Sequence, residues 1–183
     1  MKYWKVTTVA LVVLILIWSS LLVLKGRRSV PKPIVIRAAV DADFRGSAAL
    51  QYAAKRYRQR GAKYIWGTND CSVFVSDYLL RLPHPPKTRL TTWNLNQVDV
   101  EPFGLTIEGS VKPGDVLNYR YRSRKRNEVA GHCGVVVQKP DGLWVVHNCV
   151  SMGLAIQRIS SFYTTAQSLG VSKLEVTVLR PKK

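Results

Sequence analysis

The elements that the sequence predicts, two helices followed by several short strands, indicate an α+β domain. The helices are expected at residues 47–60 and 71–80, and the strands follow residue 110. The chain has 183 residues, enough for one domain with a hydrophobic core behind an N-terminal appendage. We therefore expect this domain to occupy residues 44–183.

An uncharged apolar stretch precedes the domain at residues 6–24. At about 1.5 Å per residue, a helix of this length nearly matches the ~30 Å hydrocarbon layer of a membrane. We expect residues 1–25 to form one transmembrane anchor. A cleaved signal peptide with Lys2 and Lys5 as its basic start is the alternative, but the apolar run is long for one and no small-x-small site precedes Lys25.

The basic residues that flank this stretch leave its orientation open. More of them follow it than precede it, and the positive-inside rule would keep the following domain in the cytoplasm. Long C-terminal domains often cross the membrane despite such charges. We expect a single pass through the inner or plasma membrane, with the domain facing the periplasm or cell wall. An extended tether at residues 26–43, which contains Pro31 and Pro33, would join the two.

The chain is strongly basic, with 28 Lys and Arg residues against 11 acidic ones and a formal charge of +17. Such a charge indicates an anionic partner, which can be phospholipid, cell-wall polymer or nucleic acid. The densest cationic segment contains Arg120, Arg122, Arg124, Lys125 and Arg126. With its interleaved tyrosines it would suit a nucleic-acid strand, and a solvated loop beside an anionic polymer or lipid is an equally good interpretation.

The second predicted helix places a cysteine at its first position. Gly67 allows a sharp turn before the helix, and Asn69 or Asp70 can cap it. The apolar face that follows contains Val73, Phe74, Tyr78 and Leu80. At a helix start a thiol lies among unpaired amide donors at the positive end of the helix dipole, which favours the thiolate. Cys71 is therefore a candidate nucleophile, and a small buried apolar residue is the alternative.

The other elements are expected from local patterns. Ser47 is expected to cap the first helix and Gly61 to end it. The sequence Pro140-Asp141-Gly142 lies between two β-branched runs and predicts a hairpin. The expected strands lie within residues 111–119, 131–138, 143–150, 156–159 and 174–179. Residues 87–109 give no clear assignment.

The predicted hairpin carries two histidines, His132 and His147, which can be cross-strand neighbours. Side chains alternate along a strand, so if both share one face, Cys149 shares it too. Cys133 and Asn148 then lie on the other face, which disfavours a disulfide between Cys133 and Cys149. With the helix-start cysteine, this gives the set that a cysteine hydrolase needs, a thiol and imidazoles brought together by folding.

In that arrangement His132 would hold Cys71 as a thiolate and then protonate the leaving amine, while His147 would fix the tautomer and orientation of His132. The Cys71 amide and the Tyr64 hydroxyl are candidate donors to the oxyanion. A metal site formed by Cys71, the two histidines and Cys149 is the alternative, but no pair has the close spacing of zinc knuckles. We therefore expect no metal and no cofactor.

Five short motifs occur in a particular order along residues 47–150. They are Tyr64-Ile65-Trp66-Gly67, Asp70-Cys71-Ser72-Val73-Phe74, Pro113-Gly114-Asp115-Val116, His132-Cys133-Gly134-Val135-Val136 and His147-Asn148. In type and order this series resembles the NlpC/P60 family of papain-like cell-wall cysteine peptidases. That family shows Tyr-x-Trp-Gly-Gly, Asp-Cys-Ser-Gly-Phe, Pro-Gly-Asp-Leu, His-Val-Gly-Ile-Tyr and His-Ala.

The resemblance implies a small papain-like α+β fold in which the helix bearing Cys71 packs on an antiparallel sheet. It implies that Cys71 is the nucleophile, His132 the base and His147 the third polar residue. The substrate and oxyanion residues that it implies are Tyr64, Asp70 and Ser72. The implied substrate is a peptidoglycan stem peptide, often cut between D-glutamate and a diamino acid.

The sequence thus predicts a membrane-anchored cysteine peptidase or amidase that hydrolyses amide bonds in peptidoglycan. Two other functions stay open. One is a tethered binding module whose basic segment grips nucleic acid or an acidic polymer. The other is a thiol acyltransferase of the same fold, facing the cytoplasm, since related folds carry several reactions on the same residues.

Overall fold

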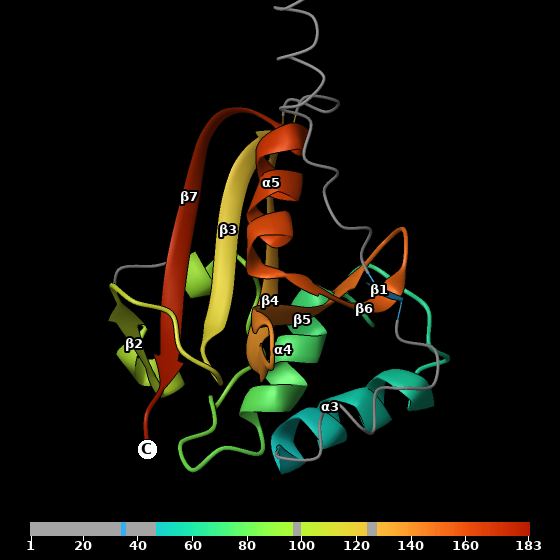
Figure 1. The fold of residues 1–183 in the computed structure, drawn as a ribbon. Coiled ribbons are helices and arrows are strands. Elements are labelled where there is room, and N and C mark those ends of the chain that lie inside the picture. The colour runs from blue at the N-terminus through green and yellow to red at the C-terminus, as the bar shows by residue number, and fades with distance from the viewer. Residues whose placement is uncertain (1–33, 36–46, 97–99, 124–127) are drawn as a thin grey trace, which may run out of the picture. The chain divides into compact units, whose positions relative to one another are not determined.

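The computed structural model describes residues 34–35, 47–96, 100–123 and 128–183. Within them, three α-helices and one antiparallel sheet of seven strands confirm the expected α+β class (Figure 1). The helices are α3 (Ala48–Gln59), α4 (Cys71–Leu79) and α5 (Ile159–Leu169), with two short 3-10 helices, η1 (Asn94–Asn96) and η2 (Glu101–Phe103). The strands, in their order across the sheet, are β1 (Ile34–Val35), β6 (Gly153–Arg158), β5 (Gly142–Cys149), β4 (Val129–Lys139), β3 (Val116–Ser123), β7 (Gly170–Pro181) and β2 (Leu105–Glu108).

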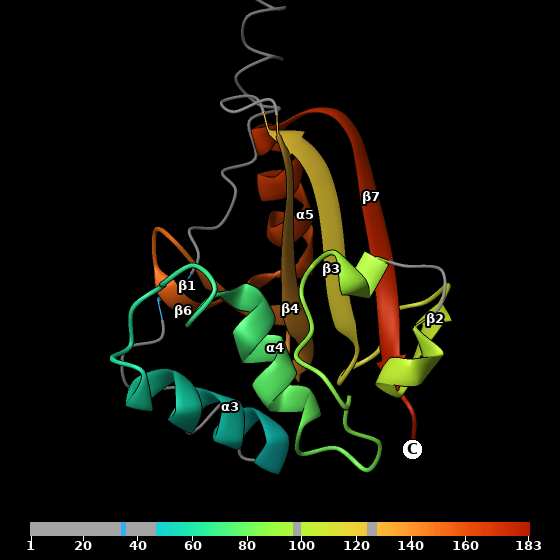
Figure 2. The ribbon, with the colours of Figure 1, turned by 180° about the vertical axis from the view of Figure 1, so that it is seen from behind.

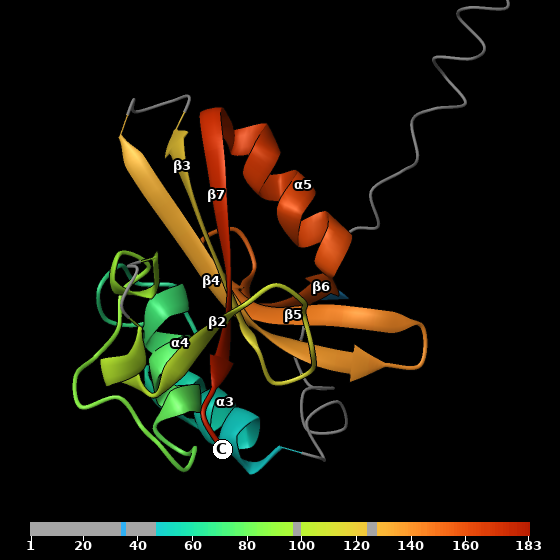
Figure 3. The same ribbon diagram turned by 90° about the vertical axis from the view of Figure 1, so that its left-hand side faces the viewer.

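Different helices cover the two faces of the sheet (Figure 3). Helices α3 and α4 pack on one face, where Phe74 of α4 shares a core with Cys133 and Val135 of β4. Helix α5 packs on the other face, where Phe162 shares a second core with Tyr119 of β3. Seen from behind, α3 and α4 lie in front of the sheet and α5 lies beyond it (Figure 2). Alternate residues of β4 therefore meet different helices.

The first helix has the ends that the sequence predicts. Ser47 Oγ accepts a hydrogen bond from the backbone N–H of Leu50 at 3.2 Å, which confirms Ser47 as the N-cap of α3. Near the other end, the Tyr57 hydroxyl donates to the backbone O of Ala62 at 2.7 Å and accepts from the N–H of Leu154 at 3.1 Å. These bonds fix the loop after α3 against β6 and so place the segment that leads to α4.

The predicted hairpin is confirmed as β4 and β5. The two strands pair in antiparallel register from Lys139 opposite Gly142 to Val135 opposite Val146. The Trp144 indole N–H donates to the Asp141 carboxylate at 2.8 Å beside the turn. Since the register is set by the Pro-Asp-Gly turn, local chemistry decides which residues of the hairpin share a face.

Three expectations about the other elements need correction. The strand expected at residues 156–159 is β6, which ends at Arg158, and Ile159 begins helix α5. The sequence patterns did not predict α5: its first residue, Ile159, was assigned to a strand, and residues 160–169 were assigned to no element. Strand β3 continues to Ser123, so Arg120 and Arg122 lie on a strand and not in a loop. Leu80, assigned to the buried face of the second helix, is 49 % exposed.

The predicted anchor at residues 1–25 lies outside the described residues, as do Arg124, Lys125 and Arg126 of the basic segment. In the ranges that the structure does describe, no helix is both long and apolar enough to cross a membrane. Within the predicted tether, residues 34–35 form β1 and pair with Ile156 and Ala155 of β6.

Candidate active site

The start of α4 is held by the side chain of Asp70. Its Oδ1 accepts hydrogen bonds from the backbone N–H groups of Ser72 and Val73, each at 3.0 Å, and from the Ser72 hydroxyl at 2.7 Å. Its Oδ2 accepts from the N–H of Gly67 at 2.7 Å. Asp70 is therefore the N-cap of α4, and it fixes both the first helical turn and the loop that leads to Cys71.

Asn69, the other cap that the sequence allowed, holds the loop before the helix instead. Its side-chain amide donates to the backbone O of Lys63 at 2.8 Å. Its own backbone O accepts a hydrogen bond from the side-chain amide of Asn148, which belongs to β5. This bond joins the loop to the hairpin. Asn69 thus fixes the residues before Cys71 both within the loop and against β5.

A cleft of about 300 Å³ opens in front of Cys71. One wall is the loop before α4, and the other is the segment that carries Arg89 and Thr92, which packs on the start of β4. That packing requires Gly131, since a Cβ atom there would lie 2.5 Å from Thr92 Oγ1. Trp66, which is 81 % exposed, stands at the mouth. Cys71, although largely buried, thus lines a cleft that a substrate can enter.

Two neighbours stabilise the Cys71 thiolate. A hydrogen bond with Cys133, together with the charge and hydrogen bonding of His132, lowers the pKa of Cys71 well below its usual 9.0, although burial acts in the opposite direction. Burial raises the pKa of Cys133, which therefore stays a thiol and can donate its S–H. The positive end of the α4 dipole favours the same charge state. The surroundings of Cys71 thus favour its thiolate form.

His132 and His147 form the second half of the site. Nε2 of His132 lies 2.8 Å from Nδ1 of His147, and the two rings are perpendicular. Burial and the charge of His132 lower the pKa of His147 well below 6.5. His147 is therefore neutral at neutral pH and can accept the Nε2–H of His132. This leaves Nδ1 of His132 to exchange a proton with Cys71.

Sequence reasoning missed the residues that hold the two histidines in place. Phe162 of α5 is fully buried, with its ring centre 5.5 Å from that of His132 and 5.4 Å from that of His147. Gly134 lets β5 approach closely, because a Cβ atom there would lie 2.6 Å from Val145 Cγ1, 2.8 Å from the backbone O of Val146 and 3.0 Å from the Cβ of His147. Only Gly134, inside a recognised motif, had a signal in the sequence.

The predicted alternation of side chains along the hairpin is confirmed. Cys133 shares the core beneath α4 with Cys71, whereas His132 and His147 pack beneath α5. The three cysteines are free, so Cys133 and Cys149 are not bridged, as their opposite faces predict. Cys71 is the first residue of α4 and interacts with both Cys133 and His132. Among the described residues, no group of three or more His, Cys, Asp or Glu side chains is arranged to hold a metal ion.

The three residues expected to contact substrate all line the cleft, but they differ in whether their polar atoms are already hydrogen-bonded within the protein. Tyr64 lines one wall, and burial raises its pKa, so its hydroxyl stays protonated and can donate. Asp70 and Ser72 also line the cleft, but their polar atoms bond to each other and to the helix start. Four of the six predicted site residues, Tyr64, Asp70, Cys71 and Ser72, thus line the cleft. His132 and His147 do not line it and pack against Phe162 beneath α5.

The described part of the basic segment lies on β3, close to an exposed aromatic residue. The Arg120 guanidinium stacks over Trp93, 3.9 Å from the ring centre, and Trp93 is 58 % exposed. This contact fixes one cation of the segment by a cation–π interaction.

The described residues thus form an α+β domain in which a helix-start thiol borders an open cleft, and a pair of histidines packs beneath α5 on the other face of the sheet. Neither a protein-family model nor a curated protein sequence matches this chain. Its function has to be inferred from the chemistry that this arrangement can perform.

Proposed function

We propose that this chain is a cysteine hydrolase of the NlpC/P60 type, which cleaves amide bonds in peptidoglycan stem peptides. The observation that carries the proposal is the interaction of Cys71, at the start of α4, with His132, which in turn lies 2.8 Å from His147. In this proposal the nucleophile Cys71 interacts with the base His132, and His132 interacts with the orienting residue His147, as nucleophilic catalysis by a thiol requires. A papain-like fold is part of this proposal.

The first half of the reaction forms a thioester. The Cys71 thiolate attacks the carbonyl carbon of the scissile amide, and the carbonyl oxygen becomes an oxyanion. The first amide of a helix has no partner within the helix, so the Cys71 N–H can donate to that oxygen together with the Tyr64 hydroxyl. The His132 imidazolium then gives its proton to the leaving amine, and the C–N bond breaks.

The second half of the reaction returns the enzyme to its starting state. His132, now neutral, removes a proton from water, and the resulting hydroxide attacks the thioester carbonyl. The C–S bond breaks, the acyl group leaves as a carboxylic acid, and the thiolate is paired again with the protonated imidazole. His147 accepts the Nε2–H of His132 throughout, so the reacting nitrogen keeps its tautomer and its direction.

The proposal includes a location and a second contact. A membrane anchor at residues 6–24 would hold the domain at the inner or plasma membrane, facing the cell wall. The basic segment that contains Arg120 and Arg122 would contact anionic polymer or lipid. The support for both is the apolar stretch and the charge of +17 in the sequence.

Digestion of purified peptidoglycan sacculi tests the proposed chemistry. The full chain is expected to release new amino groups and carboxylates from sacculi, and Cys71→Ala is expected to lower that rate at least about a thousandfold, because the acyl acceptor is lost. Cys149→Ala, which removes a free thiol outside the proposed triad, should retain the wild-type rate. A Cys71→Ala variant that still digests sacculi would contradict the proposal.

A further inference from the structure

Two of the three free cysteines are hydrogen-bonded neighbours in the core. Cys71 is the first residue of α4, and Cys133 lies on β4 in the same hydrophobic cluster. Both the thiol and the backbone N–H of Cys133 hydrogen-bond to the Cys71 side chain. The packing of α4 on β4 therefore places side by side two thiols that lie far apart in the sequence.

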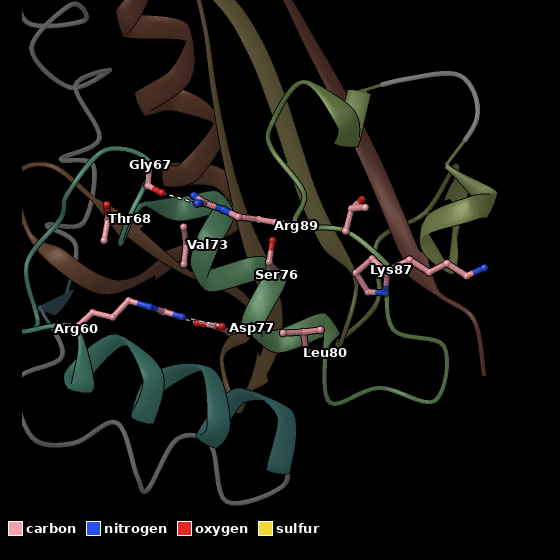
Figure 4. Close-up of a pocket in the computed structure, with 11 residues that line it drawn as sticks. Arg60, Gly67, Thr68, Val73, Ser76, Asp77, Leu80, Lys87 and Arg89 are labelled. Atoms are coloured by element: carbon pink, nitrogen blue, oxygen red, sulfur yellow. Dashed lines mark hydrogen bonds and ion pairs between the residues drawn. The ribbon is translucent and has the colours of Figure 1, made fainter.

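A small oxidant can reach Cys71 but has no direct access to Cys133. Cys71 lines the cleft of about 300 Å³, whereas Cys133 is completely buried. A second space beside α4, a cavity of about 380 Å³, is lined by Val73, Ser76 and Leu80 among others (Figure 4), and neither cysteine is among the described residues around it. An oxidant in the cleft therefore meets Cys71 first, and Cys71 can pass the oxidation on to Cys133.

The charge states of the two sulfurs favour the same order of events. The surroundings of Cys71 favour its thiolate, which is the form that peroxides oxidise. Burial raises the pKa of Cys133, and hydrogen bonding with Cys71 and the charge of Cys71 raise it further. Oxidation of Cys71 to a neutral sulfenic acid removes that charge, so the Cys133 thiol loses its proton more readily after the first step than before it.

We propose that hydroperoxides reversibly inactivate this chain by forming a disulfide between Cys71 and Cys133. First, the Cys71 thiolate attacks one oxygen of the peroxide, the O–O bond breaks, and the sulfur becomes a sulfenic acid while the peroxide is reduced to water or an alcohol. Then the Cys133 sulfur attacks the Cys71 sulfur, the S–O bond breaks, and the hydroxyl leaves with the Cys133 proton as water. A dithiol restores both thiols by exchange and is itself oxidised to a disulfide.

Cys133 would thus protect the nucleophile from permanent loss. A sulfenic acid without a neighbouring thiol can be oxidised further to a sulfinic acid, which a dithiol does not reduce. The NlpC/P60 motif His-Val-Gly-Ile-Tyr that the chain resembles has Val at this position, so the proposed hydrolysis does not require a second thiol there. The inference goes beyond the proposed function, because the disulfide depends on the two sulfurs and not on the substrate.

Oxidation of the full chain with excess hydrogen peroxide, followed by mass mapping without reduction, tests this proposal. The wild type should give a pair of peptides joined through Cys71 and Cys133, and its free thiols should fall from three to one. Dithiothreitol should then restore at least about nine-tenths of the iodoacetamide labelling of Cys71. Cys149→Ala is the matched control, because Cys149 lies near Ser151 and outside the pair, and it should give the same linked peptides and the same recovery.

Cys133→Ser removes the second sulfur and keeps a hydroxyl that can donate to Cys71. Peroxide should carry Cys71 of this variant to the sulfinic acid, so that dithiothreitol restores less than about a tenth of its labelling. Circular dichroism shows whether the variant is folded, and if it is not, the linked peptides of the wild type decide the question.

Four results would overturn the proposal. They are a wild-type Cys71 that becomes a sulfinic acid while Cys133 stays free, a Cys71 that peroxide leaves unmodified, a bridge to Cys149, and full recovery of labelling in folded Cys133→Ser. The mapping uses no substrate, so a linked pair in a chain that digests no sacculi would support the disulfide and contradict only the hydrolase.

Discussion

Replacing His132 with alanine should lower kcat/KM for peptide hydrolysis by about a thousandfold or more. The change removes the group that stabilises the Cys71 thiolate and also the proton donor for the leaving amine, and general acid–base catalysis alone typically contributes about 10²–10⁴. The measurement is release of lysine from L-alanyl-γ-D-glutamyl-L-lysine by the full chain, with circular dichroism to show that the variant is folded.

His84→Ala is the matched control for that experiment. His84 lies in the loop that follows α4 and is exposed. Its ring hydrogen-bonds to the backbone O of Lys183. The substitution removes an imidazole without touching the cleft, so the rate should stay within about twofold. A His132→Ala enzyme that is folded and keeps more than a tenth of the wild-type rate would show that another group supplies the proton.

Replacing Asp70 with alanine should lower the free energy of unfolding by about 2–4 kcal/mol and abolish most of the activity. The carboxylate caps α4 at the N–H groups of Ser72 and Val73 and binds the Gly67 N–H. Loss of an N-cap costs roughly 1 kcal/mol, and each buried donor left without a partner costs about 1–3 kcal/mol more. Urea unfolding followed by far-UV circular dichroism measures the change.

Asp70→Asn separates the cap from the charge. The amide keeps one acceptor oxygen for the first turn of α4 but loses the acceptor for Gly67, so about half of the loss is expected. Thiol titration under native conditions should show Cys71 more accessible in Asp70→Ala than in Asp70→Asn. A change below about 0.5 kcal/mol in Asp70→Ala would contradict the capping role.

Sequence patterns predicted the elements that are fixed by contacts between residues close together in the sequence. Ser47 and Asp70 bond to amides two or three residues away, and the hairpin register follows from the turn at residues 139–142. The shared face of His132 and His147 follows from that register. The helix-start cysteine and the histidine pair could therefore be named before the structure was known.

The parts that were missed depend on contacts between distant segments. Helix α5 follows β6 without a break, and its Phe162 reaches the histidines only because the helix packs across β3 and β5. Arg89 lies in a segment without a period, so nothing local marked it as a wall of the cleft. The contact of Cys71 with Cys133 joins a helix to a strand, and no spacing rule predicts it.

The pH dependence of Cys71 alkylation tests the central claim most directly. Iodoacetamide labelling of the full chain, followed by mass mapping, should modify Cys71 before Cys133 and Cys149. Because the pKa of Cys71 lies well below its usual 9.0, its labelling rate should reach a plateau at lower pH than that of an ordinary thiol, and His132→Ala should move the plateau to higher pH. An identical profile in the two proteins would show that the imidazole at 132 does not share a proton with the sulfur at 71.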